Sequence, residues 1–281
     1  MSKPLVSILI TAYNRGKYIR EAVNSVLQSS YQELEVIILD DRSTDDTWEI
    51  IQQLQPTDNR IRIYQNERNL KQFQNRNQAA RYAQGKYLKF VDSDDIIYTY
   101  AIAQMVDAME QFPEAKFGVF SNTTNDQKPY PYLVDKEEAY RQYFTKGSDV
   151  LGMGPMGVIF RTDFFHEIGG FTDLSILGDT TILFEAIQRS PVVKIGASQF
   201  WWRLHDDQVY TNPALVAEHI IQRKRIHLTY LSERYTKGMG LPLAYLRRQQ
   251  IKHYYKHGVR LLLSGDWQSA GRLWQHRSAP N

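Results

Sequence analysis

The segment Gly85-Lys86-Tyr87-Leu88-Lys89-Phe90-Val91-Asp92-Ser93-Asp94-Asp95 joins a short, apolar, β-rich run to three closely spaced carboxylates. Three earlier stretches have the same form, a short β-rich run that enters a polar or acidic loop: residues 5–11, 36–39 and 61–64. Amphipathic helical patterns separate these runs, at residues 19–27, from about 43 to 54 and from about 72 to 84. Alternating strands and helices of this kind predict an α/β fold with a mainly parallel sheet.

Two of the helix ends carry recognisable signals. Ser43 is expected to start the second helix, because its hydroxyl can cap the helix with Asp46 three residues further on. Gly85 is expected to supply the left-handed residue that ends the third helix.

The order of the elements predicts where the loops lie. Right-handed crossovers place the carboxyl ends of parallel strands at one edge of the sheet. The loops after the first, second and fourth strands should therefore form one site, although they are far apart in the sequence.

Beyond residue 98 the strand and helix pattern continues and then changes. We expect a helix ending near Pro113, strands at 117–120 and 158–160, a short helix at 164–168 closed by Gly169 and Gly170, and a helix opening at Asp179. After Pro213 the chain is helical, basic and rich in aromatic residues. We divide the chain into residues 1–98, 99–211 and a C-terminal helical appendage, 212–281.

The composition restricts the classes of function. A net charge of +3 from 34 basic and 31 acidic residues gives no argument for a nucleic-acid partner, and we expect none. There is no cysteine, which excludes disulfides and thiolate metal sites and fits a reducing compartment. No uninterrupted apolar stretch approaches about 20 residues, so we expect no segment that crosses a bilayer.

The three carboxylates of Asp92, Asp94 and Asp95 are the strongest chemical signal. Carboxylates packed this closely repel one another unless a cation neutralises them. A divalent ion bridging them to a diphosphate would also stabilise the charge on a departing nucleoside diphosphate. A solvated turn that caps a helix is the alternative interpretation.

The other two loops at the expected edge carry groups that suit a nucleotide. Asp41, after the second strand, can accept hydrogen bonds from a nucleobase or a ribose, whereas the neighbouring Ser43, Asp45 and Asp46 are explained by helix capping alone. The first loop, residues 11–15, offers hydroxyls and the ring of Tyr13, on which a base could stack.

Several nucleotide-binding motifs are absent from the sequence. There is no G-x-G-x-x-G of a dinucleotide-binding fold and no G-x-x-x-x-G-K-[ST] of a P-loop hydrolase. The acidic pair follows the fourth strand, whereas an aspartyl phosphatase would need it after the first.

Taken together, residues 11–14, 38–47 and 85–95 resemble the family 2 glycosyltransferases in order and spacing. The resemblance covers at least residues 4–205. It implies a GT-A fold, with a Rossmann-like mixed, mainly parallel sheet, an inverting mechanism, a nucleotide-sugar donor (a UDP-sugar first) and a Mn or Mg ion. It also implies that residues 1–98 bind the nucleotide sugar and residues 99–211 the acceptor. The nucleotide-binding residues it implies are Thr11, Tyr13, Asn14, Arg15, Asp41, Lys71, Arg76, Asp92, Ser93 and Asp94.

The resemblance implies further roles in the second half of the chain. An inverting enzyme needs a base near the acceptor hydroxyl, and Asp179 is the candidate, with Asp173 and Glu185 in reserve and a helix N-cap as the alternative reading. The implied metal ligands are Asp94, Asp95 and His205, and Arg203 is a weaker candidate for a phosphate contact. The acceptor side is assigned to Gly154, Pro155 and Met156.

The chain departs from the family pattern at two of these places. Arg42 stands where the family usually has glycine, and Gly178-Asp179 keeps only the second acid of a frequent Glu-Asp pair.

The expected partners are a nucleotide-sugar donor and a glycan or lipid-linked acceptor, as in surface polysaccharide or glycolipid synthesis. We expect a cytoplasmic protein. Peripheral contact of the basic C-terminal helices with the inner face of the membrane is one alternative, a solvated face over an aromatic core is another, and homodimer formation stays open. Two rival functions also stay open, a non-catalytic nucleotide-sugar or glycan-binding protein and a sugar nucleotidyltransferase, whose Gly-rich basic loop is poorly matched by residues 14–17.

Overall fold

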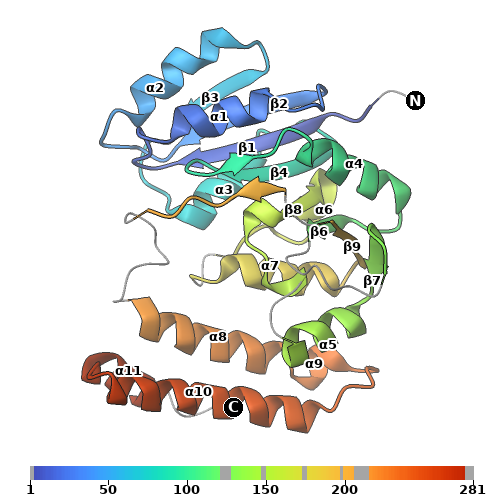
Figure 1. Ribbon diagram of the computed structural model, residues 1–281, viewed down its shortest axis with the longest axis vertical. Coiled ribbons are helices and arrows are strands. Elements are labelled where there is room, and N and C mark those ends of the chain that lie inside the picture. Colours follow the sequence, from blue (N-terminus) through green and yellow to red (C-terminus); the bar gives the residue numbers. More distant parts are fainter. Residues whose placement is uncertain are drawn as a thin grey trace.

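The computed structural model describes residues 3–120, 128–146, 150–172, 176–196, 199–205 and 215–275. Its centre is an eight-stranded sheet with the order β3-β2-β1-β4-β8-β6-β9-β7 (Figure 1). The strands are β1 (Val6–Ala12), β2 (Leu34–Asp40), β3 (Ile61–Gln65), β4 (Tyr87–Asp92), β6 (Phe117–Phe120), β7 (Tyr132–Val134), β8 (Val158–Arg161) and β9 (Val192–Ile195). The four strands expected in the first hundred residues are confirmed.

The sheet is mixed and mainly parallel at its N-terminal half, as expected. Strands β3, β2, β1 and β4 run parallel, whereas β8 is antiparallel to both β4 and β6. The register pairs Ala12 with Asp40 and Thr11 with Asp92. The loops after β1, β2 and β4 therefore leave the sheet side by side, at what we call the carboxyl edge.

In the first hundred residues the helices follow the strands in the order that the sequence predicts, whereas the helix at 136–146 and the strands β7 and β9 were not expected. The helices are α1 (Ile19–Leu27), α2 (Thr47–Leu54), α3 (Gln72–Ala80), α4 (Ala101–Gln111), α5 (Lys136–Lys146), α6 (Thr162–Glu167) and α7 (Gly178–Ile187), with short 3₁₀ turns η1 (Gln55–Thr57), η2 (Val150–Gly152) and η3 (Pro155–Gly157). The C-terminal helices are α8 (Val216–Tyr230), α9 (Glu233–Thr236), α10 (Leu243–Leu263) and α11 (Trp267–Gln275). In Figure 1 α8, α10 and α11 form a layer beyond α7 and α5.

A second, two-stranded sheet was not expected. It pairs β5 (Ile96–Ile97) with β10 (Phe200–Trp201) in antiparallel register. Because β5 follows the acidic residues directly, this pairing brings residues 202–205 beside them from more than one hundred positions away.

Buried apolar residues divide into one large cluster and one small one. The large cluster extends over the whole sheet and includes Leu231 and Leu246 from the C-terminal part. The small cluster, Ile221, Tyr254 and Leu273, holds α8, α10 and α11 together. Within the residues that the structure describes, no helix is both long and apolar enough to span a bilayer.

The two expected helix-end signals are wrong, whereas a third is confirmed. Ser43 does not cap α2: its hydroxyl donates to Asp40, and α2 begins only at Thr47. Gly85 has no left-handed backbone, and α3 already ends at Ala80. Glycine is required at position 85 because a Cβ there would lie 2.7 Å from the Leu5 carbonyl oxygen and from the Ser7 nitrogen. After α6, Gly169 and Gly170 do take left-handed conformations.

Candidate active site

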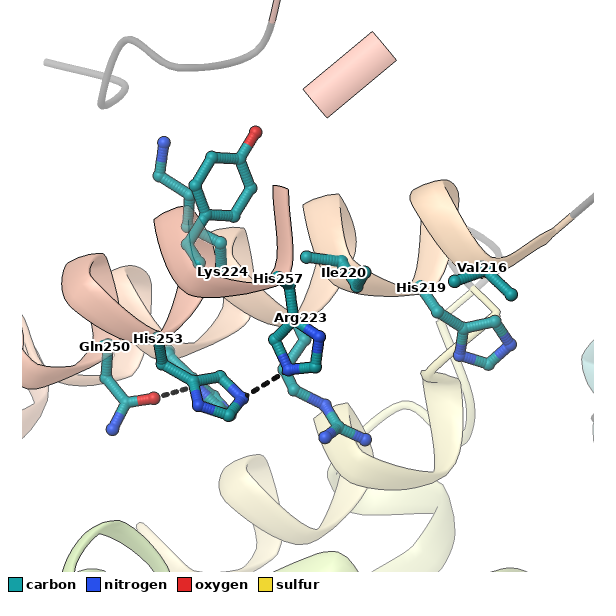
Figure 2. A pocket seen from close by; sticks show the side chains of 10 residues that line it. Val216, His219, Ile220, Arg223, Lys224, Gln250, His253 and His257 are labelled. Atoms are coloured by element: carbon teal, nitrogen blue, oxygen red, sulfur yellow. Dashed lines mark hydrogen bonds between the residues drawn. The ribbon is translucent and has the colours of Figure 1, made fainter. Parts of the chain in front are cut away.

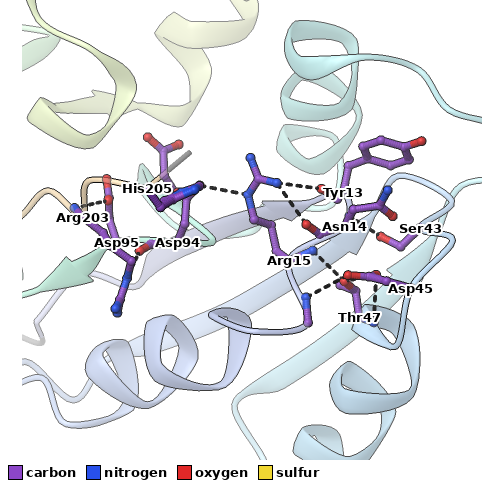
Figure 3. Close-up of polar contacts among 12 residues, drawn as sticks. Tyr13, Asn14, Arg15, Ser43, Asp45, Thr47, Asp94, Asp95, Arg203 and His205 are labelled. Carbon is purple, nitrogen blue, oxygen red and sulfur yellow. Dashed lines mark hydrogen bonds and ion pairs between the residues drawn. The ribbon is translucent and has the colours of Figure 1, made fainter. Parts of the chain in front are cut away.

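The acidic loop, residues 92–95, lies at the carboxyl end of β4. Within this loop, Asp94 contacts other segments of the chain. Asp94 Oδ2 lies 2.9 Å from Arg15 Nε and 3.1 Å from His205 Nε2 (Figure 3). Arg15 comes from the loop after β1, and His205 from the segment after β10. The His205 ring also packs against Tyr18, with ring centroids 4.8 Å apart. Two segments distant in sequence therefore converge on the carboxylate of Asp94.

Asp95 lies in a different environment from Asp94. Its carboxylate is buried and accepts a hydrogen bond of 2.9 Å from the backbone N–H of Arg203. Burial, with the charges of Asp92 and Asp94, raises the pKa of Asp95 to about 7. Arg203 also donates from Nε to the Asp94 carbonyl oxygen at 2.8 Å and from its guanidinium to Glu21. Asp95 and Arg203 thus fasten the acidic loop to the segment after β10.

The side chains at Asp94 suit a divalent ion whose coordination is completed by a bound substrate. Mg²⁺ in nucleotide sites is commonly held by one or two carboxylates, and substrate phosphates and water complete its coordination. One carboxylate oxygen and one imidazole nitrogen, 3.1 Å apart, are of this kind. Among the described residues, no three His, Cys, Asp or Glu side chains gather as a metal site, and Asp95 is directed elsewhere. Asp94 and His205 therefore fit as the protein ligands of such an ion.

The loop after β1 is joined to the loop after β2 by a set of short contacts. Asn14, whose backbone φ is 53°, donates its N–H to Ser43 Oγ at 2.9 Å and accepts at Oδ1 from the N–H of Thr44 at 2.8 Å. The Arg15 N–H donates to Thr47 Oγ1 at 2.7 Å. Tyr13 remains exposed beside these two hydrogen-bonded loops (Figure 3). A planar ring presented in this way is suited to stacking on a base.

The buried carboxylate of Asp41 organises the loop that precedes α3. Asp41 Oδ1 accepts from Asn66 Nδ2 at 2.8 Å and from the N–H of Leu70 at 2.7 Å, and Oδ2 accepts from the N–H of Lys71 at 3.0 Å. Burial raises the pKa of Asp41, and these three hydrogen bonds oppose the shift. Each carboxylate oxygen can accept two hydrogen bonds, so Oδ2 retains capacity for a further donor.

Arg42 and Lys71 both have a positive backbone φ, and Arg42 is one of the departures from the family pattern. Arg42 has φ of 63°, in the region that glycine tolerates best, and this is the position at which the resembling family usually has glycine. Lys71 has φ of 70° and ψ of 168°, a combination that is otherwise almost restricted to glycine. The backbone N–H of Lys71 donates a hydrogen bond to Asp41, whereas the Lys71 side chain is exposed.

Arg76, on α3, connects the acidic loop to the rest of the site. Its side chain is buried, and Nη2 lies 2.5 Å from Asp92 Oδ1. Two further guanidinium nitrogens, Nε and Nη1, are buried without a hydrogen-bond partner among the described residues. Unsatisfied buried donors cost free energy, and an anionic ligand could relieve this cost.

Asp179 lies in the first turn of α7, close to Arg76 and Asp92. Its Oδ1 accepts from the N–H of Thr180 at 2.7 Å, and the helix itself begins one residue earlier, without a side-chain cap. Burial raises the pKa of Asp179, the positive charge of Arg76 lowers it, and the negative charge of Asp92 raises it again. A raised pKa suits a group that must accept a proton near neutral pH.

The missing acid before Asp179 has a steric explanation. A Cβ at Gly178 would lie 2.9 Å from two carbons of the Phe73 ring on α3. Phe73 in turn stacks on Phe171, with ring centroids 5.5 Å apart. Glycine at 178 therefore allows α3, which carries Arg76, to pack directly on the start of α7.

The predicted acceptor segment lies beneath the acidic loop and depends on a lysine that the sequence analysis did not select. Lys89, fully buried in β4, donates from Nζ to the carbonyl oxygens of Phe90, at 2.7 Å, and of Met156. Met156 Sδ accepts from the N–H of Asp92 at 3.1 Å. Pro155 and Met156 are buried, whereas Gly154 is partly exposed with no described atom within 4 Å of the position of a Cβ. A lysine inside an otherwise apolar strand was the available signal for this contact.

The two reserve candidates for the base differ in status. Glu185 accepts a hydrogen bond of 2.7 Å from the hydroxyl of Tyr230, which joins α7 to α8. Asp173 lies outside the described residues.

Residues 7–169 match the family model described as "Glycosyl transferase family 2". Among curated proteins, the chain is 42% identical over 146 residues to the Escherichia coli UDP-Glc:alpha-D-GlcNAc-diphosphoundecaprenol beta-1,3-glucosyltransferase WfaP, an alignment that covers 52% of this chain and 53% of WfaP. The chain covers between 36% and 53% of the length of the first curated relatives it matches.

Two solved structures share the fold over nearly the whole chain. One is Staphylococcus aureus TarS, residues 1–349, in complex with UDP-GlcNAc, with a TM-score of 0.68, 20% identity and coverage of 98% of this chain and 82% of that one. The other is the mannosyltransferase PcManGT of Pyrobaculum calidifontis in complex with GDP-Man and Mn²⁺, with a TM-score of 0.61, 15% identity and coverage of 98% and 86%. The expected GT-A architecture with a helical C-terminal region is confirmed.

Proposed function

Because this chain belongs to glycosyl transferase family 2, we propose that it transfers a sugar from a nucleotide diphosphate to an acceptor hydroxyl, with inversion at the anomeric carbon. The observation that carries the proposal is the charge group formed by Asp92, Arg76 and Asp179. These residues come from β4, α3 and α7, and they join the acidic loop to a carboxylate of raised pKa. The transfer requires this proximity, because the diphosphate of the donor and the base that deprotonates the acceptor must both lie near the anomeric carbon.

In the proposed reaction the acceptor hydroxyl loses its proton to the Asp179 carboxylate as its oxygen attacks the anomeric carbon. The bond between that carbon and the diphosphate oxygen breaks, and the nucleoside diphosphate leaves with the electron pair. Attack on the face opposite the leaving group inverts the configuration. General base catalysis of this kind contributes roughly 10² to 10⁴ in rate.

The donor would lie along the carboxyl edge. The unsatisfied N–H groups of Arg76 and the guanidinium of Arg15 are the cationic groups available to the diphosphate. The nucleobase of the donor would lie against Tyr13 and Thr11, with a hydrogen bond to the remaining lone pair of Asp41 Oδ2. The roles of Asn14 and Lys71 are then to hold the two loops that line this pocket, as their hydrogen bonds support.

We propose a Mn or Mg ion held by Asp94 and His205, since these residues fit such an ion. When bound, it would supply positive charge that neutralises the diphosphate and stabilises the leaving group. The complex of PcManGT with GDP-Man and Mn²⁺ is consistent with this choice. Asp95, given as a further ligand by the sequence, is proposed instead to hold the acidic loop in place through Arg203.

For the substrates we propose a UDP-sugar and a lipid-linked acceptor of surface polysaccharide synthesis. TarS was solved with UDP-GlcNAc, and the name of WfaP gives a UDP-Glc donor and a diphosphoundecaprenol acceptor. Such an acceptor resides at a membrane, and we propose that the basic C-terminal helices contact its cytoplasmic face. Their exposed aromatic and aliphatic side chains support this proposal: Tyr245, Tyr255, Leu263, Trp267 and Trp274.

Release of nucleoside diphosphate from a panel of UDP- and GDP-sugars, with Mn²⁺ and membrane extract as the source of acceptor, tests the proposal. Transfer predicts release that depends on both donor and acceptor. A binding protein on the same scaffold would instead raise its melting temperature with a donor and release nothing from any mixture. That second outcome would refute the proposed activity.

A further inference from the structure

A cavity of about 310 Å³ lies between α8 and α10, apart from the carboxyl edge (Figure 2). Six of its ten lining side chains carry or can take up a positive charge: His219, Arg223, Lys224, His227, His253 and His257. None of the described residues that line it is acidic. A concave site with one sign of charge raises the local concentration of ions of the opposite sign.

The imidazoles of His253 and His257 lie in a positive field. The pKa of His253 is lowered first by burial and then by the charges of Arg223, Arg260 and Lys256. The pKa of His257 is lowered by burial and by its neighbours, which include His253 and the same three cations. A bound anion would offset this repulsion.

Three polar groups of the cavity lie on one side: His253 and His257 on α10 and Arg223 on α8. Nε2 of His253 and Nε2 of His257 are 2.9 Å apart on successive turns of α10. Figure 2 shows this pair above the guanidinium of Arg223, which extends from α8. His227 already contacts Tyr143 at 2.9 Å and Gln250 at 2.7 Å, so it forms the wall. The planar fork of an arginine matches the oxygens of a phosphate group.

The cavity also has apolar groups in its lining, which come from the first turns of α8. Val216 and Ile220 line it, and Val216 is exposed. The pKa of Tyr143, raised chiefly by burial, is lowered by the charge of Arg223 and raised by that of Asp179. Tyr143 is therefore within electrostatic range of both the cavity and the base.

We propose that the cavity between α8 and α10 binds a phosphate or diphosphate group that carries an apolar substituent. If the proposed function holds, this group is the diphosphate of the lipid-linked acceptor. The phosphate of a bilayer lipid has the same chemistry. The described residues form no three-ligand metal cluster there, and a cation would meet the charge of Arg223.

Calorimetric titration of the whole chain with inorganic pyrophosphate tests the site without donor or turnover. Arg223→Gln and His253→Gln should each weaken binding by about tenfold or more, since hydrogen bonds to charged groups are lost. Arg225→Gln, which removes an exposed arginine from the same helix outside the cavity, should leave binding unchanged. The wild type and the three variants share the same carboxyl edge, so any pyrophosphate that binds there contributes equally to each titration and does not affect the comparison.

Equal affinity of the wild type and all three variants would overturn the proposal, as would an equal loss in Arg223→Gln and Arg225→Gln. These results do not depend on whether the chain transfers sugar, so failure of the proposed function is detected separately.

Two further measurements distinguish the sources of the phosphate. If an acceptor diphosphate occupies the cavity, Arg223→Gln raises KM for a lipid-linked acceptor and leaves KM for a phosphate-free glycoside unchanged. If a bilayer lipid occupies it, Arg223→Gln loses flotation with vesicles of phosphatidylcholine and phosphatidylglycerol, and both KM values stay the same. Either result supports a phosphate site, whereas no change in KM or in flotation contradicts it.

Discussion

Replacing Lys89 with methionine should remove a specific pH dependence of stability. Burial lowers the pKa of Lys89 from 10.5 to about 7, although the charges of Asp92 and Asp95 oppose the shift. The folded state therefore binds fewer protons than the unfolded state between about pH 7 and 10.5. Stability rises with pH across this window. For these two pKa values the gain between pH 7 and pH 9 is about 2 kcal/mol.

Urea unfolding at pH 7 and pH 9, followed by far-ultraviolet circular dichroism, measures this gain. The wild type should gain about 2 kcal/mol more than Lys89→Met over this interval. Lys86→Met is the matched control: Lys86 is an exposed lysine near the start of the same strand, paired with Glu110, and its loss should leave the slope unchanged. The same pH dependence in the wild type and in Lys89→Met would refute the reasoning, because the buried ammonium would then carry no ionisation cost.

Three further predictions concern stability and metal use. Lys71→Gly should raise the free energy of unfolding by about 1 kcal/mol, as the strain at φ of 70° outweighs the entropy of glycine; lower stability in urea would contradict it. Burial lowers the pKa of His227 to about 4, so stability is lost as pH falls from about 6.5 toward 4, by about 2 kcal/mol between pH 7 and 4.5. His227→Gln should lose this dependence and exposed His166→Gln should keep it, and identical melting profiles would contradict the assignment. Chelation should stop turnover, and His205→Gln should raise the Mn²⁺ concentration for half-maximal rate about tenfold or more, whereas full activity in EDTA would exclude the metal role.

The first half of the fold could be predicted because its signals are local. Residues 5–11 and 87–91 are apolar runs with polar loops after them, and the crossover rule alone placed Tyr13, Asp41 and Asp94 at one edge. Arg76 and Asp179 were assigned to the site through the family resemblance, and the structure brings both close to Asp92.

The parts that the sequence did not reveal depend on contacts between distant residues. The pairing of Trp201 with Ile96 involves strands of two residues, too short for a periodic pattern, yet it determines where His205 lies. Gly85 was assigned to a helix end because glycine often stands there, whereas it is needed where β1 and β4 approach each other. Ser43 had two hydrogen-bonding roles open to it, and Asp40 is its partner.

Homodimer formation and the division of the chain at residues 98 and 211 stay predictions. The first division falls between β5 and α4 while the main sheet continues through both halves, and the second lies outside the described residues.

The rate of nucleoside diphosphate release by Asp179→Asn, measured together with the Kd for the donor, tests the proposed mechanism most directly. Asp163→Asn is the matched control: at the start of α6, Asp163 accepts a hydrogen bond of 2.7 Å from the next N–H, as Asp179 does, but it is exposed and away from the carboxyl edge. With Asp179 as the base, Asp179→Asn loses about 10² to 10⁴ in kcat, keeps its donor Kd, and differs from Asp163→Asn, which retains full activity. A kcat for Asp179→Asn within a few-fold of the wild type would contradict the account.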